Sequence, residues 1–426
     1  MTHDANGAGR RATRTTKTGK GTKPMTRSLS IGLGLGAACV IAAAWQVADL
    51  PAAWAQQPAP PPPMAPGPPE PAASTAMTTP ALTGPLVANP NPITFDTGVF
   101  GKMYFTGAIT GMGLFQSDPV PGNSHTHFDL TNGHFMLQKT EGMVQFFTQG
   151  GVYSFPALGA PYFHVAKTTG NTFGAFPVAY GKLAPTDEFS VLVGKLPTLI
   201  GAEYAFTYQN MNIERGLLWN QEPIISRGIQ ANYATGPLTL SLSLNDGFYS
   251  NNYNWITGLA SYAMNKENTV AVAAGGNFGR SAKNNFVTFL NQNNSTIVNL
   301  IYTYNAAPWT ITPYFQYTNV PANPAIGIAS QGSTYGGAIL ANYNINDNVN
   351  LAARAEYIGS SGSNNLLYGP GSSAASLTLT PTWQNGVYFL RGEASVVQAF
   401  DTPGAFGRAG TARTQARWVL ETGIMF

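Results

Sequence analysis

The chain has 426 residues, of which 44% are hydrophobic and only 10% are charged. Soluble domains usually carry about 25% charged residues, so this chain lacks the charge that keeps an ordinary globular surface dispersed. Residues 1–55 hold 7 of the 22 basic and 2 of the 19 acidic residues, which leaves 15 basic against 17 acidic residues in the remainder. The formal charge of +3 therefore comes from the N-terminus and gives no reason to expect nucleic-acid binding.

Residues 1–55 have the order of a secretory signal. Seven basic residues precede an unbroken apolar run from Ile31 to Ala44, and Ala53-Trp54-Ala55 offers a cleavage site. We therefore expect export, with cleavage near Ala55. After residue 55, no apolar run reaches the roughly 18 residues that a transmembrane helix needs, so helical membrane spans are excluded there.

Residues 56–95 are rich in Pro and Ala and begin QQPAPPPPMAPGPPEP. Such a composition cannot build a packed core, so we expect a disordered linker followed by a folded domain over residues 96–426. The only cysteine, Cys39, lies in the signal. The exported chain is therefore expected to have no disulfide bond, no thiol nucleophile and no cysteine metal ligand.

From Phe95 onward, apolar and polar residues alternate along short segments. In PLTLSLSLNDG the leucines occupy positions 238, 240, 242 and 244, which places them on one face of a strand but would scatter them around a helix. The sequence predicts sixteen such strands, at 103–114, 133–139, 142–150, 174–183, 187–196, 226–235, 237–246, 256–264, 269–277, 296–304, 309–318, 335–344, 349–358, 376–384, 387–397 and 416–426.

The connections between these segments alternate strictly between short and long. Seven are short, such as 235–237 and 384–386, and eight are long, such as 151–173 and 197–225. Bacterial outer-membrane barrels have an even number of antiparallel strands, short periplasmic turns and long extracellular loops. We therefore predict an all-β fold, a 16-stranded antiparallel transmembrane β-barrel. A soluble β-sandwich or propeller is the alternative.

The final stretch, RWVLETGIMF, is predicted to close this barrel. Within lipid every backbone polar group must be bonded internally, so the last strand is expected to pair with the first. Aromatic residues anchor barrels at the two membrane interfaces. The aromatic girdle is expected to include Trp255, Trp309, Trp383, Trp418 and Phe426.

Three late strands carry charges of both signs on the face opposite their apolar residues. An arginine that faced lipid near mid-membrane would cost about 2 to 4 kcal/mol, so we expect these side chains to face water and line a passage. The predicted pore-wall residues are Arg354, Glu356, Arg391, Glu393, Arg417 and Glu421.

The longest connection, 197–225, is the third long loop and combines charges with the apolar cluster Leu217-Leu218-Trp219. An external loop does not need such a cluster. We therefore predict that the loop folds into the lumen and narrows it, because opposed charges in a constriction raise the field and exclude large solutes. The predicted constriction residues are Glu203, Glu214, Arg215 and Glu222. The alternative is an external cap that packs on neighbouring loops or on another subunit.

Residues 194–254 contain GKLPTLIGAEY, NIERGLLWNQEP, SRGIQ and NDGFYSNNYNW, the last of which runs on to Trp255. In these motifs the chain resembles the OmpL-like family of β-barrel porins of Gram-negative bacteria. The resemblance implies a porin but supplies no catalytic or ligand-binding residues. The Pro-rich leader is not a feature of the family core, so the resemblance leaves its role open.

Nothing in the sequence predicts an enzyme, a cofactor or a metal site. His125 and His127 lie in a region rich in Gly, Asn and Ser, with Asp129 as the only acidic neighbour, which favours a solvated loop over a metal site. No histidine shares a recognisable catalytic motif with a serine.

Two functions remain open from the sequence. The first is a porin in the outer membrane for passive diffusion of small hydrophilic solutes. The second is a plugged or structural barrel whose long loops bind an external partner. The expected partners are outer-membrane lipid, small hydrophilic solutes and, through the C-terminal strand, the barrel-assembly machinery. A homotrimer is expected only by analogy with barrels of this size.

Overall fold

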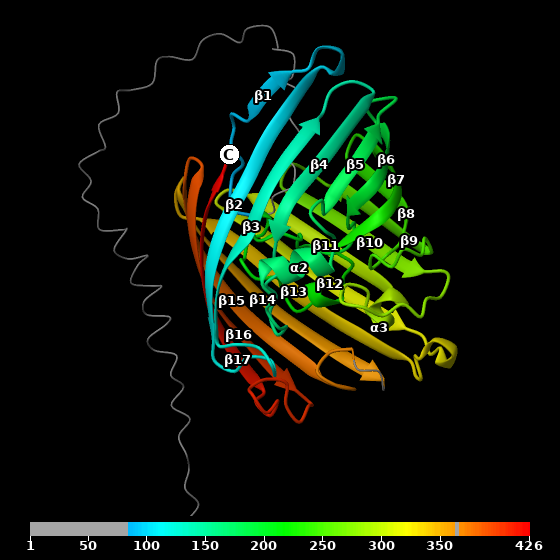
Figure 1. The fold of residues 1–426 in the computed structure, drawn as a ribbon, viewed down its shortest axis with the longest axis vertical. Helices are drawn as coiled ribbons and strands as arrows, with labels where there is room; N and C mark the ends of the chain where they lie inside the picture. The colour runs from blue at the N-terminus through cyan, green and yellow to red at the C-terminus, as the bar shows by residue number, and fades with distance from the viewer. Residues whose placement is uncertain (1–83, 363–365) are drawn as a thin grey trace, which may run out of the picture.

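The computed structural model describes residues 84–362 and 366–426. The predicted signal peptide, and the predicted linker up to residue 83, lie outside the described residues. Strands β2 to β17 each pair antiparallel with their neighbours in sequence, and β17 pairs antiparallel with β2 (Figure 1). The predicted closed 16-stranded antiparallel barrel is therefore confirmed.

The barrel strands are β2 (Lys102–Gln116), β3 (Thr126–Lys139), β4 (Val144–Tyr153), β5 (Val178–Leu183), β6 (Phe189–Pro197), β7 (Ile225–Thr235), β8 (Leu238–Asn245), β9 (Trp255–Ala263), β10 (Asn268–Asn277), β11 (Thr296–Ala306), β12 (Trp309–Val320), β13 (Gly332–Asn344), β14 (Val349–Gly362), β15 (Ser373–Asn385), β16 (Tyr388–Phe400) and β17 (Thr414–Met425). A short strand, β1 (Ile93–Asp96), precedes them. Short helices lie in the connections: α2 (Val165–Asn171), α3 (Leu290–Asn293), η1 (Gly98–Phe100), η2 (Thr207–Gln209), η3 (Trp219–Gln221) and η4 (Pro324–Ile326).

The connections between barrel strands alternate in length, as predicted. Those at one end of the barrel have two to five residues, whereas those at the other end have at least nine, and the longest joins β6 to β7. None of the helices in the described parts of the chain is long and apolar enough to cross a membrane.

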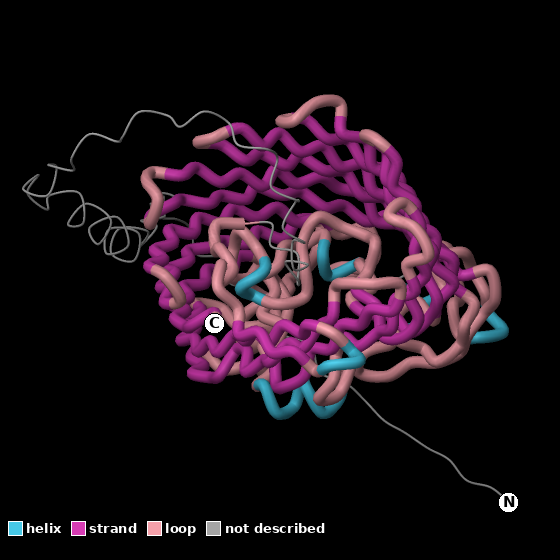
Figure 2. The backbone as a smooth tube through the Cα atoms, turned by 90° about the horizontal axis from the view of Figure 1, so that it is seen from above, coloured by secondary structure: helices cyan, strands magenta, loops and turns pink. Residues whose placement is uncertain are grey.

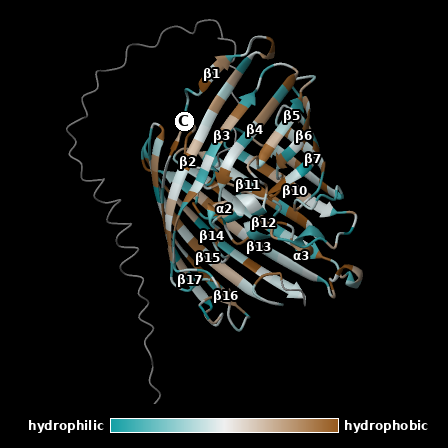
Figure 3. Ribbon diagram, in the orientation of Figure 1, coloured by the Kyte–Doolittle hydropathy of each residue, from teal (hydrophilic) through white to brown (hydrophobic). Residues whose placement is uncertain are grey.

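Hydrophilic and hydrophobic residues alternate along many strands (Figure 3), and the exposure of their side chains shows that they form two faces of the sheet. On β8, Leu240, Leu242 and Leu244 are exposed on the outside, whereas Ser243 and Asn245 between and beside them are buried. The outer face is therefore apolar, as contact with lipid requires.

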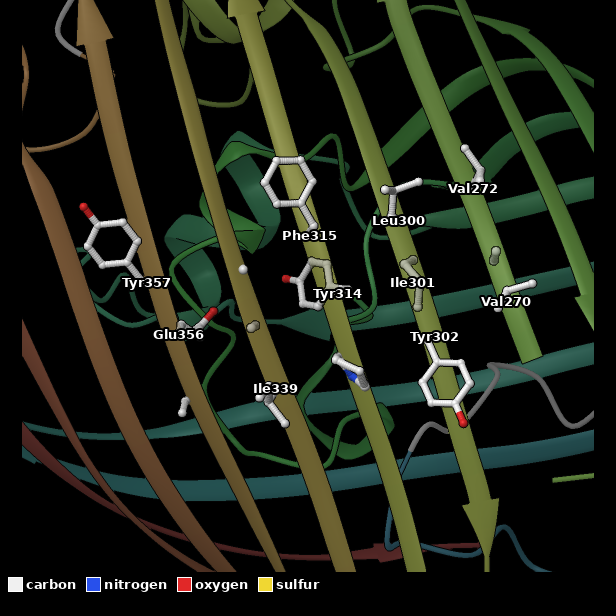
Figure 4. Close-up of a pocket in the computed structure, with 15 residues that line it drawn as sticks. Val270, Val272, Leu300, Ile301, Tyr302, Tyr314, Phe315, Ile339, Glu356 and Tyr357 are labelled. Atoms are coloured by element: carbon white, nitrogen blue, oxygen red, sulfur yellow. The ribbon is translucent and has the colours of Figure 1, made fainter. Parts of the chain in front are cut away.

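A shallow hollow of about 820 Å³ marks the outer face of β10 to β14 (Figure 4). It forms where Pro313, Gly337 and Ala355 leave space between larger outward side chains such as Phe315 and Tyr357. Its lining is almost wholly apolar, so the hollow belongs to the surface that acyl chains cover.

The seam between β2 and β17 is sealed by backbone and aromatic contacts. Gly107 and Phe426 exchange two backbone hydrogen bonds of 2.8 and 2.9 Å. The Phe426 ring lies over Gly107, and a Cβ added to Gly107 would lie only 2.3 Å from this ring. The centres of the Phe426 and Phe105 rings are 6.1 Å apart. Beyond this point β1 continues along the same edge of β2, with Ile93 opposite Phe105.

The structure corrects two predicted boundaries. Residues 93–95 were expected in the disordered linker, but they pair with β2 as part of β1. The loop expected at 115–132 is shorter, because β3 already begins at Thr126 and pairs with β2 around a β-bulge at Thr110 and Gly111. A bulge adds a residue to one strand, which interrupts the regular alternation that the sequence analysis relied on.

Candidate functional site

The 27-residue connection between β6 and β7, here called segment 198–224, contacts the inner face of β14, β16 and β17. Figure 2, which looks along the barrel, shows the strands as a ring with loop segments inside it. Most residues from 203 to 223 are buried. The charged side chains of the wall and of segment 198–224 therefore meet each other.

The first contact is centred on Arg354 of β14. Its Nη1 donates to Glu203 Oε1 at 2.6 Å and to the carbonyl oxygen of Glu214 at 2.8 Å. Its Nε lies 3.2 Å from Oε2 of Glu356, two residues along the same strand. Glu356 Oε2 also accepts a hydrogen bond from the backbone N–H of Leu217 at 3.0 Å. Arg354 and Glu356 thus hold both the side chains and the backbone of segment 198–224.

The second contact joins Arg417 of β17 and Glu393 of β16 to the same segment. Arg417 Nη1 donates to Glu214 Oε1 and to the carbonyl oxygen of Ala157, both at 2.7 Å. The Glu393 carboxylate accepts the backbone N–H groups of Ile213 at 2.6 Å and of Glu214 at 3.1 Å. Two adjacent N–H groups therefore bind one carboxylate.

The third contact is a cross-strand ion pair. Arg391 and Glu421 face each other in the β16–β17 register, and Arg391 donates to Glu421 Oε2 from Nε at 3.1 Å and also from Nη2. The remaining donors of Arg391 bind the carbonyl oxygens of Asn210 at 3.0 Å and Thr207 at 2.9 Å, and the Thr207 hydroxyl donates to Glu421. Charge and backbone polarity are thus both satisfied.

These contacts correct the expectation that the six wall residues face open water. Arg354, Arg391 and Glu421 are 0% exposed, and the other three are buried as well. They lie on the inner face, but segment 198–224 covers them. The sequence could not reveal this, because half of their partners are backbone N–H and C=O groups that almost every residue carries.

Arg215 and Glu222 behave differently from the anchoring residues. Arg215 is fully buried, with its guanidinium 5.3 Å from the centre of the Trp219 ring, and burial lowers its pKa to about 10. Glu222 lines a cavity of about 100 Å³. Among the described residues, neither oxygen of its carboxyl group has a hydrogen-bond partner.

Residues 84–87 also enter the interior, which the sequence did not indicate. Gly84 lies against the backbone of Met211 in segment 198–224, where a Cβ would approach within 2.6 Å. Leu86 is buried in the cluster that includes Met425. Val87 and the side chain of Gln384, close to the β15–β16 turn, exchange two hydrogen bonds of 2.8 Å. The chain therefore runs along the inner wall before it reaches β1.

The inner face of β7 to β11 has a different lining. Close to the short turns it presents uncharged hydroxyl and amide side chains that are only partly buried, and the register places them on the same face as the charged residues. They are Asn232, Ser241, Ser261, Thr269 and Thr303. Nearer the long loops the polar side chains of this face are buried: Gln230, Ser243, Asn245, Thr257 and Asn299.

Of the five predicted girdle residues, four lie on the outer face. Trp309 and Trp383 are 44% and 41% exposed, and Trp418 and Phe426 are half-buried. Trp255 was predicted wrongly: it is 0% exposed, faces inward, and donates its indole N–H to the carbonyl oxygen of Asn293 at 2.9 Å. Its neighbour Ile256 takes the outward position, and a buried indole needs such an acceptor.

The four histidines among the described residues lie in β3 and in loops close to it. His127, expected in a solvated loop, is buried at the start of β3 and makes hydrogen-bond contacts with Asn123 and Ser124. His164 contacts Asp129 at 3.2 Å. Among the described residues, no three His, Cys, Asp or Glu side chains gather in a way that could hold a metal ion.

A closed 16-stranded antiparallel barrel with an apolar outer face and a polar interior defines a transmembrane β-barrel of the bacterial outer-membrane type. A family model agrees: the family described as "Putative beta-barrel porin-2, OmpL-like" matches residues 102–426. The chain belongs to this family. No curated protein matches the chain in sequence.

Several solved structures with a similar fold are described as outer-membrane proteins or porins. The channel DcaP of Acinetobacter baumannii is 11% identical, with a TM-score of 0.53 over 78% of this chain and 99% of that one. An anion-selective porin from Comamonas acidovorans is 11% identical, with a TM-score of 0.52 over 76% and 99%. OmpT of Vibrio cholerae, in a trimer form, is 10% identical, with a TM-score of 0.50 over 76% and 99%. At these identities the likeness concerns the fold alone. Family and fold together indicate the outer membrane.

Proposed function

We propose that this chain is a porin through which small hydrophilic solutes diffuse passively, without catalysis and without a cofactor. The uneven lining of the interior carries the proposal. Segment 198–224 covers the charged wall of β14 to β17, whereas the inner face of β7 to β11 keeps partly exposed hydroxyl and amide groups close to the short turns. Sixteen strands enclose a lumen wide enough for water, and uncharged polar groups let hydrophilic molecules pass without holding them.

In this proposal segment 198–224 is the constriction. It narrows the lumen from the β14–β17 side, and Glu203 and Glu214 fix it there through Arg354 and Arg417. Because these charges neutralise each other, they anchor the segment rather than attract ions. We therefore expect weak charge selection by the intact pore.

A plugged barrel is the second candidate. The dense hydrogen bonding of segment 198–224 and the burial of Leu86 favour an interior that is already filled. Planar-bilayer recording of the purified barrel, together with liposome swelling in a series of sugars, separates the two. Ohmic steps and swelling that falls with sugar size support the porin. The absence of steady channels, with no swelling, supports the plug.

Export and assembly follow from the same proposal. Residues 1–55 would act as a cleaved signal, and the C-terminal strand would engage the barrel-assembly machinery before the barrel enters outer-membrane lipid. Because a structural neighbour is described as a trimer form, a homotrimer is the proposed assembly. Analytical ultracentrifugation of the purified protein in detergent, with the mass of bound detergent subtracted, tests it.

A further inference from the structure

Glu222 differs from every other carboxylate at the contacts of segment 198–224. Glu203, Glu214, Glu356, Glu393 and Glu421 each accept hydrogen bonds from an arginine, a hydroxyl or a backbone N–H group. Glu222 is only 3% exposed, yet both of its oxygens lack partners among the described residues. A buried polar group without a partner is costly, and a ligand with hydrogen-bond donors would satisfy this one.

The cavity beside Glu222 has an aromatic lining. Its volume is about 100 Å³, and Glu222 is the one ionisable residue among the residues that line it. Aromatic faces attract cations, and small organic ammonium ions are recognised in this way. A carboxylate adds a charge-assisted hydrogen bond to an ammonium N–H. The aromatic residues of the lining are Phe173, Trp219, Phe248 and Phe289.

The electrostatic surroundings of Glu222 favour a positive ligand. Burial, and the nearby carboxylates of Glu203 and Glu356, raise the pKa of Glu222 well above its usual range. The Arg215 guanidinium lies 5.3 Å from the centre of the Trp219 ring but does not line the cavity.

The backbone makes room for this carboxyl group at Gly201. Its φ is +88°, and a Cβ there would lie 1.9 Å from Glu222 Oε2, so a side chain at this position would displace the carboxyl group. The cavity shares Val287 with an outer hollow of about 640 Å³ and shares Trp219 with an inner cavity of about 190 Å³. The site therefore lies between the long-loop surface and the barrel interior.

We propose that Glu222 and the four surrounding aromatic residues form a binding site for a small primary alkylammonium ion. The ammonium group pairs with the Glu222 carboxylate, and the alkyl part lies against the aromatic rings and Ile224. Two cationic residues, Arg227 and Lys283, line the outer hollow. Arg227 forms an ion pair with Asp246, with Nη2 2.7 Å from Oδ2. The proposal holds whether or not the barrel conducts, because its test measures binding and not transport.

The test compares propylammonium with its neutral isostere, propanol, by calorimetric titration of the purified full-length barrel. Propylammonium is expected to bind, with tryptophan fluorescence changing as Trp219 is contacted, whereas propanol binds at least about tenfold more weakly because it makes no ion pair. Glu222→Gln is expected to weaken propylammonium binding by at least about tenfold. Glu267→Gln, in the exposed turn between β9 and β10, keeps the affinity of the unmodified chain.

A second variant protects the test against misfolding. Phe289 is 52% exposed, so Phe289→Leu should leave the barrel folded, and it is expected to weaken propylammonium binding through the lost ring face. Heat-modifiable migration on gels checks that each variant is folded. Equal binding of propylammonium and propanol, no binding of either, or unchanged affinity in folded Glu222→Gln would each overturn the proposal.

Discussion

Arg354 on the barrel wall and Glu203 on segment 198–224 form an ion pair of 2.6 Å between groups 151 residues apart in the chain. Both side chains are almost wholly shielded from solvent. Buried charges are tolerated only when they are paired and hydrogen-bonded. Arg354 could therefore not be shielded from water without the partner that segment 198–224 supplies. The position of the segment and the stability of the wall are therefore coupled.

Removing Arg354 should expose that coupling. Arg354→Ala leaves Glu203 and Glu356 buried without their cation, and the loss of one partner of a buried pair costs about 3 to 5 kcal/mol. We expect the free energy of unfolding, measured by urea titration with tryptophan fluorescence, to fall by about that amount. Arg408→Ala removes an exposed arginine from a loop and should change the free energy of unfolding little. Equal effects of the two variants would contradict the anchoring role.

Reversing two wall charges should change ion preference. Arg391→Glu together with Arg417→Glu places carboxylates against Glu421 and Glu214, and the repulsion is expected to release the segment and leave negative charge on the lumen wall. The reversal potential in a salt gradient should then shift toward cation selectivity. The same change at Arg280 and Arg408, both exposed in long loops, is the control. An unchanged reversal potential would count against release of the segment and exposure of these residues to the lumen.

Burial of Glu222 predicts a dependence of stability on pH. Its pKa is raised in the folded barrel by burial and by Glu203 and Glu356, so the folded state holds a proton that the unfolded state releases above about pH 4.3. This contribution to stability is complete below that pH and is lost as pH rises toward the folded pKa. Urea titrations over pH should show a smaller decline for Glu222→Gln than for Glu267→Gln. Parallel curves would contradict the assignment.

The seam of the barrel depends on a glycine. At Gly107 a side chain would meet the Phe426 ring at 2.3 Å, so Gly107→Val should push the ring from the seam and weaken the pairing of β2 with β17. We expect a smaller fraction of heat-modifiable, folded barrel. Gly181→Val on β5, where no atom lies within 4 Å of an added Cβ, is the matched control. Equal folding of the two variants would show that the contact is unimportant.

Residues 84–87 offer a test of how open the interior is. Leu86 is buried and Val87 is 67% exposed, so Leu86→Asp should expel this stretch from the inner wall whereas Val87→Asp should leave it in place. If the stretch occupies part of the passage, single-channel conductance rises only in Leu86→Asp. A rise in both variants, or in neither, would exclude that role.

The sequence predicted the barrel well because period-two alternation is a local property. On β8 and β17 the apolar residues take every second position, and lipid outside the barrel leaves them one allowed face. The same reasoning failed for Trp255, whose strand has apolar residues on both faces, Ile256 on one and Leu259 on the other. It also missed β1, which is only four residues long and exists through its pairing with β2.

The sequence by itself determined the strand number, the alternation of short and long connections, and the inward direction of the charges on β14, β16 and β17. Each follows from neighbours along the chain and from the cost of exposing polar groups to lipid. Only the tertiary structure decided that Arg354, Arg391 and Arg417 bind segment 198–224 instead of water. These bonds join residues far apart in sequence and end largely on backbone carbonyl groups, which are chemically alike at every position. Closure of the barrel decides which of these carbonyl groups lie within hydrogen-bonding distance of the arginines.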